Sequence, residues 1–231
     1  MIDILRFFSK LLFVFLLINI VCAPPALLND DPPDTQTHDH FTGFAPVRTK
    51  AVIVALVDDA FSNIENDIIQ ETVYTLEYQT NDTIKIILVP QNEMAKPLTL
   101  PTNATIYPIM IRKVETDNPQ VMAVDDSIKG PMLGFYDAKA SPVPTIIIAY
   151  ARIQYANEYQ GVVMHELLHS IGMEHSHYEW QLMYPAISAS CMGMHDVLQL
   201  AHMFGTNPDD MHACESDSDE PVCLRDYEGN Y

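Results

Sequence analysis

The chain has 231 residues, of which 31 are acidic and 12 are basic, and its formal net charge is −19 at pH 7. This excess of negative charge excludes nucleic acids and anionic membrane surfaces as expected partners and predicts a soluble, self-repelling monomer. Hydrophobic residues make up 48% of the chain, and at this length they suffice for one sizeable core, so we expect one folded domain.

The first 23 residues have the pattern of a secretory signal peptide. Arg6 and Lys10 flank the start of an almost wholly apolar run over 11–21, and Val21-Cys22-Ala23 places a small residue at a cleavage site. This run is about half as long as a membrane span requires. We therefore expect residues 1–23 to be removed, the protein to be secreted, and no stable membrane anchor to remain.

Residues 24–47 are expected to form a flexible N-terminal arm or a short pro-segment. The segment is rich in Pro and Asp, a composition that favours solvated chain over a packed core. As the alternative, Asp34, His38, Asp39 or His40 could reach a metal ion and keep the protein latent.

The middle of the chain alternates strand-like and helix-like segments. Residues 51–57 and 83–89 are β-branched apolar runs, and residues 63–79 between them carry apolar side chains at helical spacing. Further strands are expected at 105–114, 130–136 and 145–150.

Residues 165–175, His-Glu-Leu-Leu-His-Ser-Ile-Gly-Met-Glu-His, carry the chemistry. On a helix, His165 and His169 lie on one face and can reach one metal ion. Glu166 is placed to accept a proton from an attacking water and pass it to a leaving amine. Gly172 can adopt the left-handed conformation that ends a helix, so the chain can turn back and supply His175. Three protein ligands leave a fourth position open, as in catalytic zinc sites.

This motif, with Gln181-Leu182-Met183-Tyr184-Pro185 downstream, resembles the metzincin zinc proteases and their Met-turn. Ser176 after the third His and the Met-Tyr-Pro sequence are similar to the matrixin (matrix metalloproteinase) branch. Pro185 occupies the place of an additional Tyr ligand in astacins and serralysins, so Tyr184 is not assigned to the metal. The resemblance implies that Met183 forms an apolar floor beneath the metal and that Tyr184 and Pro185 border the substrate pocket.

The resemblance continues over 195–205, which is similar to the last helix of matrixin catalytic domains. Within it, Asp196 matches a family Asp that hydrogen-bonds to the backbone of the Met-turn and so holds the geometry of the site. The alternative is that Asp196 is simply a first-turn acidic residue favoured by the helix dipole.

The resemblance covers roughly residues 48–206 and implies an α+β, zincin-like catalytic domain. This fold has a twisted, mixed five-stranded sheet with helices, a zinc helix at about 157–171, and an irregular lower subdomain. Residues 145–149 are expected to be either the edge strand that pairs with extended substrate or a central hydrophobic strand.

The activity implied is that of a secreted zinc endopeptidase acting on peptide or protein substrates. It would use one catalytic Zn²⁺, with Glu166 as general base and acid, and we expect an apolar substrate residue after the scissile bond. The alternative is a secreted zinc-binding interaction or decoy protein without general peptidase activity.

Several matrixin features have no match in this chain. No Pro-Arg-Cys-Gly motif precedes the catalytic domain, so latency through a Cys on the metal is not expected. The Gly- and Asp-rich loops that bind calcium and a structural zinc lack a match between Glu115 and Tyr150, so no second zinc is expected. Without a hemopexin-like domain, substrate docking is expected to rely on the catalytic domain alone.

Residues 207–231 are expected to form an acidic, Cys-containing tail. A disulfide between Cys214 and Cys223 would close a short acidic loop, whereas Cys191 paired with either would attach the tail to the active-site region. Calcium binding in the tail has no ligand spacing to support it, and the candidate residues are Asp217, Asp219 and Glu220. Asn81 and Asn103 begin glycosylation sequons.

Overall fold

The computed structural model describes residues 50–214, except 94–97, 99, 129 and 187–188. The expected signal peptide, the N-terminal arm and the tail beyond Cys214 lie outside the described residues. The elements in chain order are β1 (Ala51–Val57), α2 (Asn63–Gln79), β2 (Ile84–Pro90), β3 (Thr105–Lys113), α3 (Pro119–Ile128), β4 (Gly134–Asp137), β5 (Thr145–Ile148), α4 (Ala156–Ser170) and α5 (Met194–Phe204). Short 3-10 turns lie at η1 (Gln91–Glu93), η2 (Tyr150–Arg152) and η3 (Pro208–Asp210).

The five strands form one mixed sheet in the order β2-β1-β3-β5-β4. β1 pairs in parallel with β2 and β3, β3 pairs in parallel with β5, and β4 runs antiparallel to β5. The predicted α+β class with a mixed five-stranded sheet is confirmed. β5 lies inside the sheet, so the interpretation of residues 145–149 as the edge strand is wrong and the central-strand alternative holds. The edge beside α4 is formed by β4.

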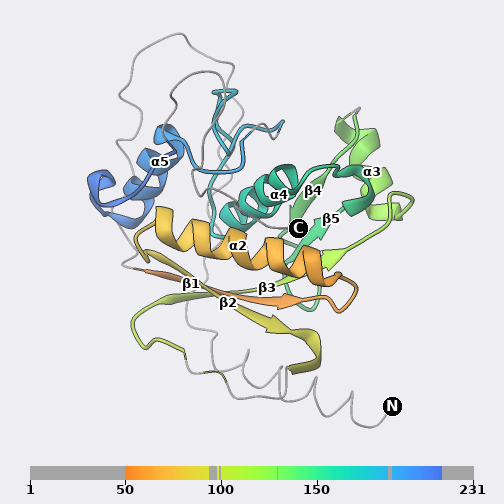
Figure 1. Ribbon diagram of the computed structural model, residues 1–231, viewed down its shortest axis with the longest axis horizontal. Helices are drawn as coiled ribbons and strands as arrows, with labels where there is room; N and C mark the ends of the chain where they lie inside the picture. Colours follow the sequence, from red (N-terminus) through yellow and green to blue (C-terminus); the bar gives the residue numbers. More distant parts are fainter. Residues whose placement is uncertain (1–49, 94–97, 99, 129, 187–188, 215–231) are drawn as a thin grey trace, which may run out of the picture. The chain divides into compact units, whose positions relative to one another are not determined.

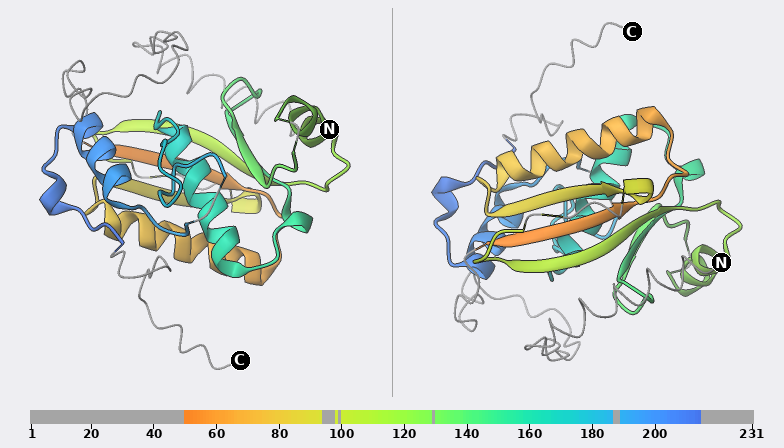
Figure 2. Two further views of the ribbon diagram at one scale, coloured as in Figure 1. Left: turned by 90° about the horizontal axis from the view of Figure 1, so that it is seen from above. Right: turned by 90° about the horizontal axis from the view of Figure 1, so that it is seen from below.

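Alternation along the strands explains why both faces of the sheet are covered. In β1, Ala51, Ile53 and Ala55 belong to the main core, whereas Val52 and Val54 join a second cluster on the other face. Helices α2 and α4 pack against each other over the main-core side (Figure 1), and Figure 2 shows β2, β1 and β3 side by side from the opposite side. Each large side chain buried in this way stabilises the fold by about 1.5–3 kcal/mol.

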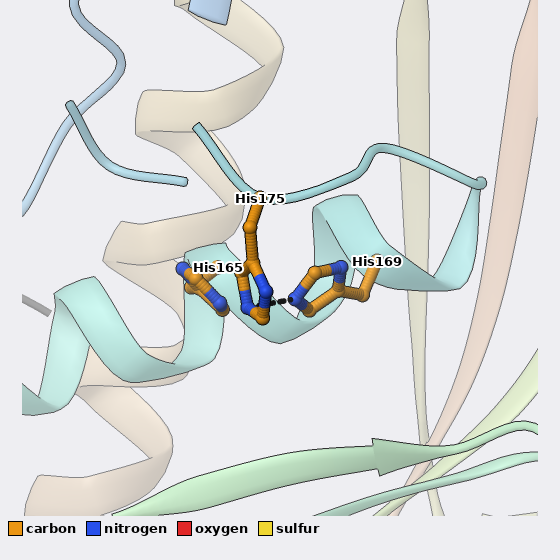
Figure 3. A group of neighbouring side chains, drawn as sticks. All are labelled: His165, His169 and His175. Atoms are coloured by element: carbon orange, nitrogen blue, oxygen red, sulfur yellow. Dashed lines mark hydrogen bonds between the residues drawn. The ribbon is translucent and has the colours of Figure 1, made fainter. Parts of the chain in front are cut away.

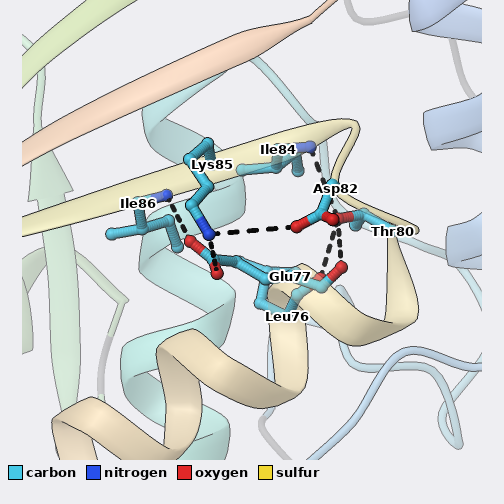
Figure 4. A network of polar contacts seen from close by, with 7 residues as sticks. All are labelled: Leu76, Glu77, Thr80, Asp82, Ile84, Lys85 and Ile86. Atoms are coloured by element: carbon cyan, nitrogen blue, oxygen red, sulfur yellow. Dashed lines mark hydrogen bonds and ion pairs between the residues drawn. The ribbon is translucent and has the colours of Figure 1, made fainter. Parts of the chain in front are cut away.

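Helix α2 starts and ends where its sequence predicts. Ser62 and Glu65 form a reciprocal capping box at the N-terminus, with Glu65 Oε2 accepting from Ser62 N at 2.6 Å. After the helix, Asn81 and Asp82 have φ values of 47° and 56° and turn the chain into β2. Glu77 accepts from Lys85 Nζ at 2.5 Å and from the backbone N of Ile86 at 2.8 Å, and Figure 4 shows how these groups lie. These contacts hold the C-terminal half of α2 against the edge strand β2.

Helix α3 was not expected from the sequence, because its apolar pattern is weak and only Val121 is buried. It is held by an ion pair in which Arg152 Nη1 and Nη2 donate to Asp125 at 2.8 and 2.5 Å. Asp125 Oδ1 also accepts from Met132 N at 2.8 Å, and Arg152 donates to Met132 O at 2.8 Å. The Arg152 guanidinium lowers the pKa of Asp125. This network joins α3 to the segment that leads into β4. Among the described residues, no helix combines the length and the apolar character needed to cross a membrane.

Candidate metal centre

Helix α4 carries the first two histidines and ends one residue before the predicted boundary. Gly172 follows at φ +97°, a conformation that L side chains rarely adopt, and Met173 N donates to Leu168 O at 3.1 Å to close the last turn. The chain therefore turns back beside α4, as the sequence predicted, and brings His175 to His169.

The three imidazoles converge on one point (Figure 3). One ring nitrogen from each of His165, His169 and His175 lies within 4.8 Å of the other two, and His169 Nε2 is 3.1 Å from His175 Nε2. His165 is buried, His169 is partly buried, and His175 is exposed. The cluster could hold a metal ion that faces solvent on the His175 side, and three neutral imidazoles with an open position suit Zn²⁺.

Backbone carbonyls orient two of these rings. His165 Nδ1 lies 2.7 Å from Leu182 O, and His169 Nδ1 lies 2.8 Å from Met173 O. Each Nδ1 can approach a carbonyl so closely only as an N–H donor, which leaves the Nε2 lone pair for the cluster. The tautomers of His165 and His169, as well as their positions, are therefore those that a zinc ion requires.

The environment keeps the rings neutral. Burial, with the neighbouring charge of His169, lowers the pKa of His165 to about 3. Burial also lowers the pKa values of His169 and His175. All three lone pairs are thus available to a metal ion at neutral pH.

Glu166 is buried beside the cluster, with a side chain that is 3% exposed. Its Oε2 has no hydrogen-bond partner among the described residues. Burial raises the pKa of Glu166 to about 8, against the opposing effect of the backbone N–H of Tyr136 on β4. A buried carboxylate with one oxygen left over is suited to taking and releasing a proton near neutral pH.

The Met-turn contacts the cluster through Leu182 O, which lies 2.7 Å from His165 Nδ1, and is held by Asp196. Leu182 and Met183 are fully buried, and their backbone N–H groups donate to Asp196 Oδ2 and Oδ1 at 2.8 and 3.4 Å. Asp196 Oδ2 also accepts from Gly193 N at 3.1 Å in the first turn of α5, so both alternatives for Asp196 apply together. Burial raises its pKa to about 6, although these N–H groups oppose the rise. Tyr184 is half-buried and Pro185 is exposed.

Gln181 contributes to the same assembly and was missed as an individual residue in the sequence. Its side-chain Oε1 accepts from the backbone N of His195 at 3.0 Å and of Asp196 at 3.2 Å. Gln181 therefore caps α5 from the Met-turn, while Asp196 caps the Met-turn from α5. The two segments exchange hydrogen bonds in both directions, which fixes their position relative to each other.

Gln79, at the C-terminal end of α2, also went unrecognised. Its side-chain amide accepts from Met192 N at 3.1 Å and donates to His212 O at 3.1 Å, and the side chain is buried. Cys191 and Cys214 form a disulfide beside it, which is one of the two pairings that attach the tail to this region. Cys223 and the candidate calcium ligands Asp217, Asp219 and Glu220 lie outside the described residues. The role of Gln79 could not be predicted from a local sequence pattern, because Met192 lies 113 positions away in the chain.

A protein-family model matches the part of the chain that carries this site. A family model described as matrixin matches residues 70–205, which is 136 of the 231 residues and includes the three histidines, the Met-turn and Asp196. No curated protein matches the chain. A solved structure of myroilysin is similar at 14% sequence identity and a TM-score of 0.32, covering 55% of this chain and 52% of that chain. This chain thus spans about half the length of that protein.

Proposed function

The chain belongs to the matrixin family, and from this membership we propose that it is a secreted zinc-dependent endopeptidase that hydrolyses peptide bonds in peptide or protein substrates. Membership of this family supports metalloprotease activity in general. The observation that carries the finer proposal is the convergence of His165, His169 and His175 beside the buried carboxylate of Glu166. Secretion is supported by the signal-peptide pattern of residues 1–23.

The residues around the site have distinct roles in this reaction. A zinc ion held by the three imidazoles would supply Lewis acidity, which lowers the pKa of water and polarises a carbonyl group. Glu166 accepts the proton of the attacking water and then donates it to the departing nitrogen of the substrate. Its buried Oε2, which has no hydrogen-bond partner among the described residues, is the oxygen available for this transfer.

Strand β4 is the surface proposed to hold the substrate backbone. Among the described residues it pairs with β5 alone, and the backbone of Tyr136 on this strand forms a hydrogen bond with Glu166. An extended peptide that adds to this edge would receive main-chain hydrogen bonds and would lie beside the general base. Tyr184 and Pro185, which follow the buried Met-turn, are proposed to border the pocket for an apolar substrate residue.

Cleavage of a mixed peptide library by the purified secreted protein, mapped by mass spectrometry, tests the proposal. We expect cuts that disappear when a chelator removes the metal and return when zinc is added. The aligned cut sites would show an apolar residue after the scissile bond. A folded, zinc-loaded protein that cuts no peptide would contradict the proposal and leave the interaction or decoy function.

A further inference from the structure

The part of the chain that builds the site carries no Lys or Arg over residues 153–224. Between Arg152 and Arg225 the sequence contains neither residue, and this stretch includes α4, the three histidines, the Met-turn and α5. The same stretch carries exposed carboxylates, which within the described residues are Glu174, Glu179, Asp209 and Asp210, with Glu158 half-buried and Glu166 and Asp196 buried. Its surface therefore has a strongly negative electrostatic potential.

Three basic side chains that precede this stretch form ion pairs with carboxylates that also precede it. Lys85 pairs with Glu77, Lys113 with Glu65 at 2.8 Å, and Arg152 with Asp125. Lys113 Nζ also lies 3.6 Å from the centre of the Tyr150 ring. These three cations therefore do not neutralise the carboxylates that follow Arg152.

One segment brings this charge directly to the metal site. We call residues 174–180 the His175 loop, because it contains the third histidine of the cluster and runs on to the Met-turn. Glu174, Tyr178, Glu179 and Trp180 are all exposed in it, with Trp180 68% and Tyr178 41% exposed. The Tyr178 ring lies 6.2 Å from that of Trp180 and 4.7 Å from that of His195 on α5. Core packing does not account for such large aromatic side chains in solvent.

Exposed aromatic rings between carboxylates are a surface for cations. Lys and Arg side chains bind over the faces of Trp and Tyr, and carboxylates add Coulomb attraction and hydrogen bonds. A second copy of the chain is a poor occupant, because its net charge of −19 opposes association. A cationic polypeptide matches both the charge and the rings.

We propose that the His175 loop selects cationic polypeptides as substrates, by binding Lys or Arg side chains that flank the scissile bond. This inference rests on the proposed peptidase function and specifies its substrate class. The apolar residue expected after the scissile bond is compatible with it, because the loop would act on flanking residues.

Trp180 gives a direct test, because it is the single tryptophan of the chain and its fluorescence reports on the loop. The zinc-loaded Glu166→Ala variant would be titrated with two peptides of one length that differ only in Lys or Gln at the flanking positions. At low salt, we expect the Lys peptide to change the Trp180 emission and to bind about 10-fold more tightly, and about 0.5 M salt should remove most of the difference. Equal affinities for the two peptides would overturn the inference.

A pair of charge variants locates the effect. Both variants are made in the Glu166→Ala background. The loop variant carries Glu174→Gln and Glu179→Gln, which removes two charges from the His175 loop. The matched control carries Asp209→Asn and Asp210→Asn, which removes two exposed charges from η3. We expect the loop variant to lose most of the preference for the Lys peptide and the control to retain it. Equal losses in the two variants would overturn the assignment to the His175 loop.

Cleavage by the native protein separates this inference from the proposed function. Faster cleavage of the Lys peptide than of the Gln peptide supports both. Equal cleavage of the two peptides retains the peptidase and contradicts the selection of cations. Tight, salt-sensitive binding of the Lys peptide with no cleavage of either peptide would retain the cation-binding surface and contradict the peptidase.

Discussion

Asp196 connects single hydrogen bonds to the geometry of the whole site. Its fully buried carboxylate accepts from Leu182 N and Met183 N, and the carbonyl of the same Leu182 orients the His165 ring. One side chain on α5 thus acts, through the Met-turn, on a ring of the candidate metal centre. Loss of this carboxylate would therefore lower the free energy of unfolding and the affinity for zinc together.

We expect Asp196→Ala to lower the free energy of unfolding by about 2–4 kcal/mol, because buried N–H groups that donate to a charged acceptor lose it. Zinc affinity should fall as well, since Leu182 O would no longer hold His165 firmly. Urea unfolding and competition with a chromogenic chelator measure the two effects. Asp209→Ala on the exposed η3 is the matched control, and an Asp196→Ala protein as stable as this control would refute the role given to Asp196.

Among the elements, β4 and α4 approach each other unusually closely, and Gly134 makes this possible. A Cβ atom on Gly134 would lie 2.6 Å from Val162 Cγ1 on α4 and 3.2 Å from Ile147 O on β5. Only glycine therefore lets the proposed substrate strand lie against the helix that carries Glu166.

Gly134→Ala is expected to push β4 away from α4 and to lower kcat/KM by about 10- to 100-fold, because a shift of about 1 Å misplaces the substrate backbone. Zinc content should not change, since the histidines lie on other segments. Gly130→Ala is the control, because a Cβ there has nothing within 4 Å. Similar kcat/KM values for the two variants would argue against β4 as the substrate strand.

The position of α5 depends on contacts with the far end of α2. Gln79→Leu keeps the volume of the side chain but leaves the buried Met192 N–H without its acceptor. We expect unfolding free energy to fall by about 1–3 kcal/mol. Gln160→Leu, which removes only a bond from Gln160 Nε2 to Thr75 Oγ1, should cost less. The midpoints of denaturant unfolding measure the loss of stability in both variants. A larger loss in Gln160→Leu than in Gln79→Leu would show that Gln79 does not hold the segment before α5 in place.

Sequence patterns predicted those elements whose signals are local. The boundaries of β1 and α2 agree with prediction, because an unbroken apolar run and a capping box define them. Gly172 likewise predicted the turn that brings His175 back to α4. The position of β5 inside the sheet and the clamp by Gln79 could not be predicted in this way, because strand order and contacts across 113 positions depend on tertiary packing. Helix α3 was missed because it buries only Val121 and is held largely by the ion pair of Asp125 with Arg152.

In the molecule as a whole, the main core and the site are only partly coupled. The core cluster is built from β1, β2, β3, β5, α2, α4 and α5 and contains Met183. The fold therefore does not depend on a metal ion in the way that a small zinc domain does. Zinc should raise stability by mass action alone.

Zinc removal by a chelator is expected to leave the far-UV circular dichroism unchanged at 25 °C and to lower Tm. With free zinc at about 100 times its Kd, the loss is about 2.7 kcal/mol, which corresponds to a decrease of roughly 5–10 °C for a domain of this size. The His169→Ala variant should show no such dependence on zinc. Unfolding at 25 °C on chelation, or an unchanged Tm, would show that the site and the fold are coupled differently.

The most direct test of the central claim is a comparison of kcat/KM between the native protein and Glu166→Gln at equal, measured zinc content. If the three histidines hold the metal and Glu166 transfers the proton, the variant keeps its zinc and loses at least about 100-fold in kcat/KM. Glu158→Gln, earlier on the same helix, should retain native activity. A Glu166→Gln protein with zinc bound and activity within a factor of about 3 of native would contradict the account.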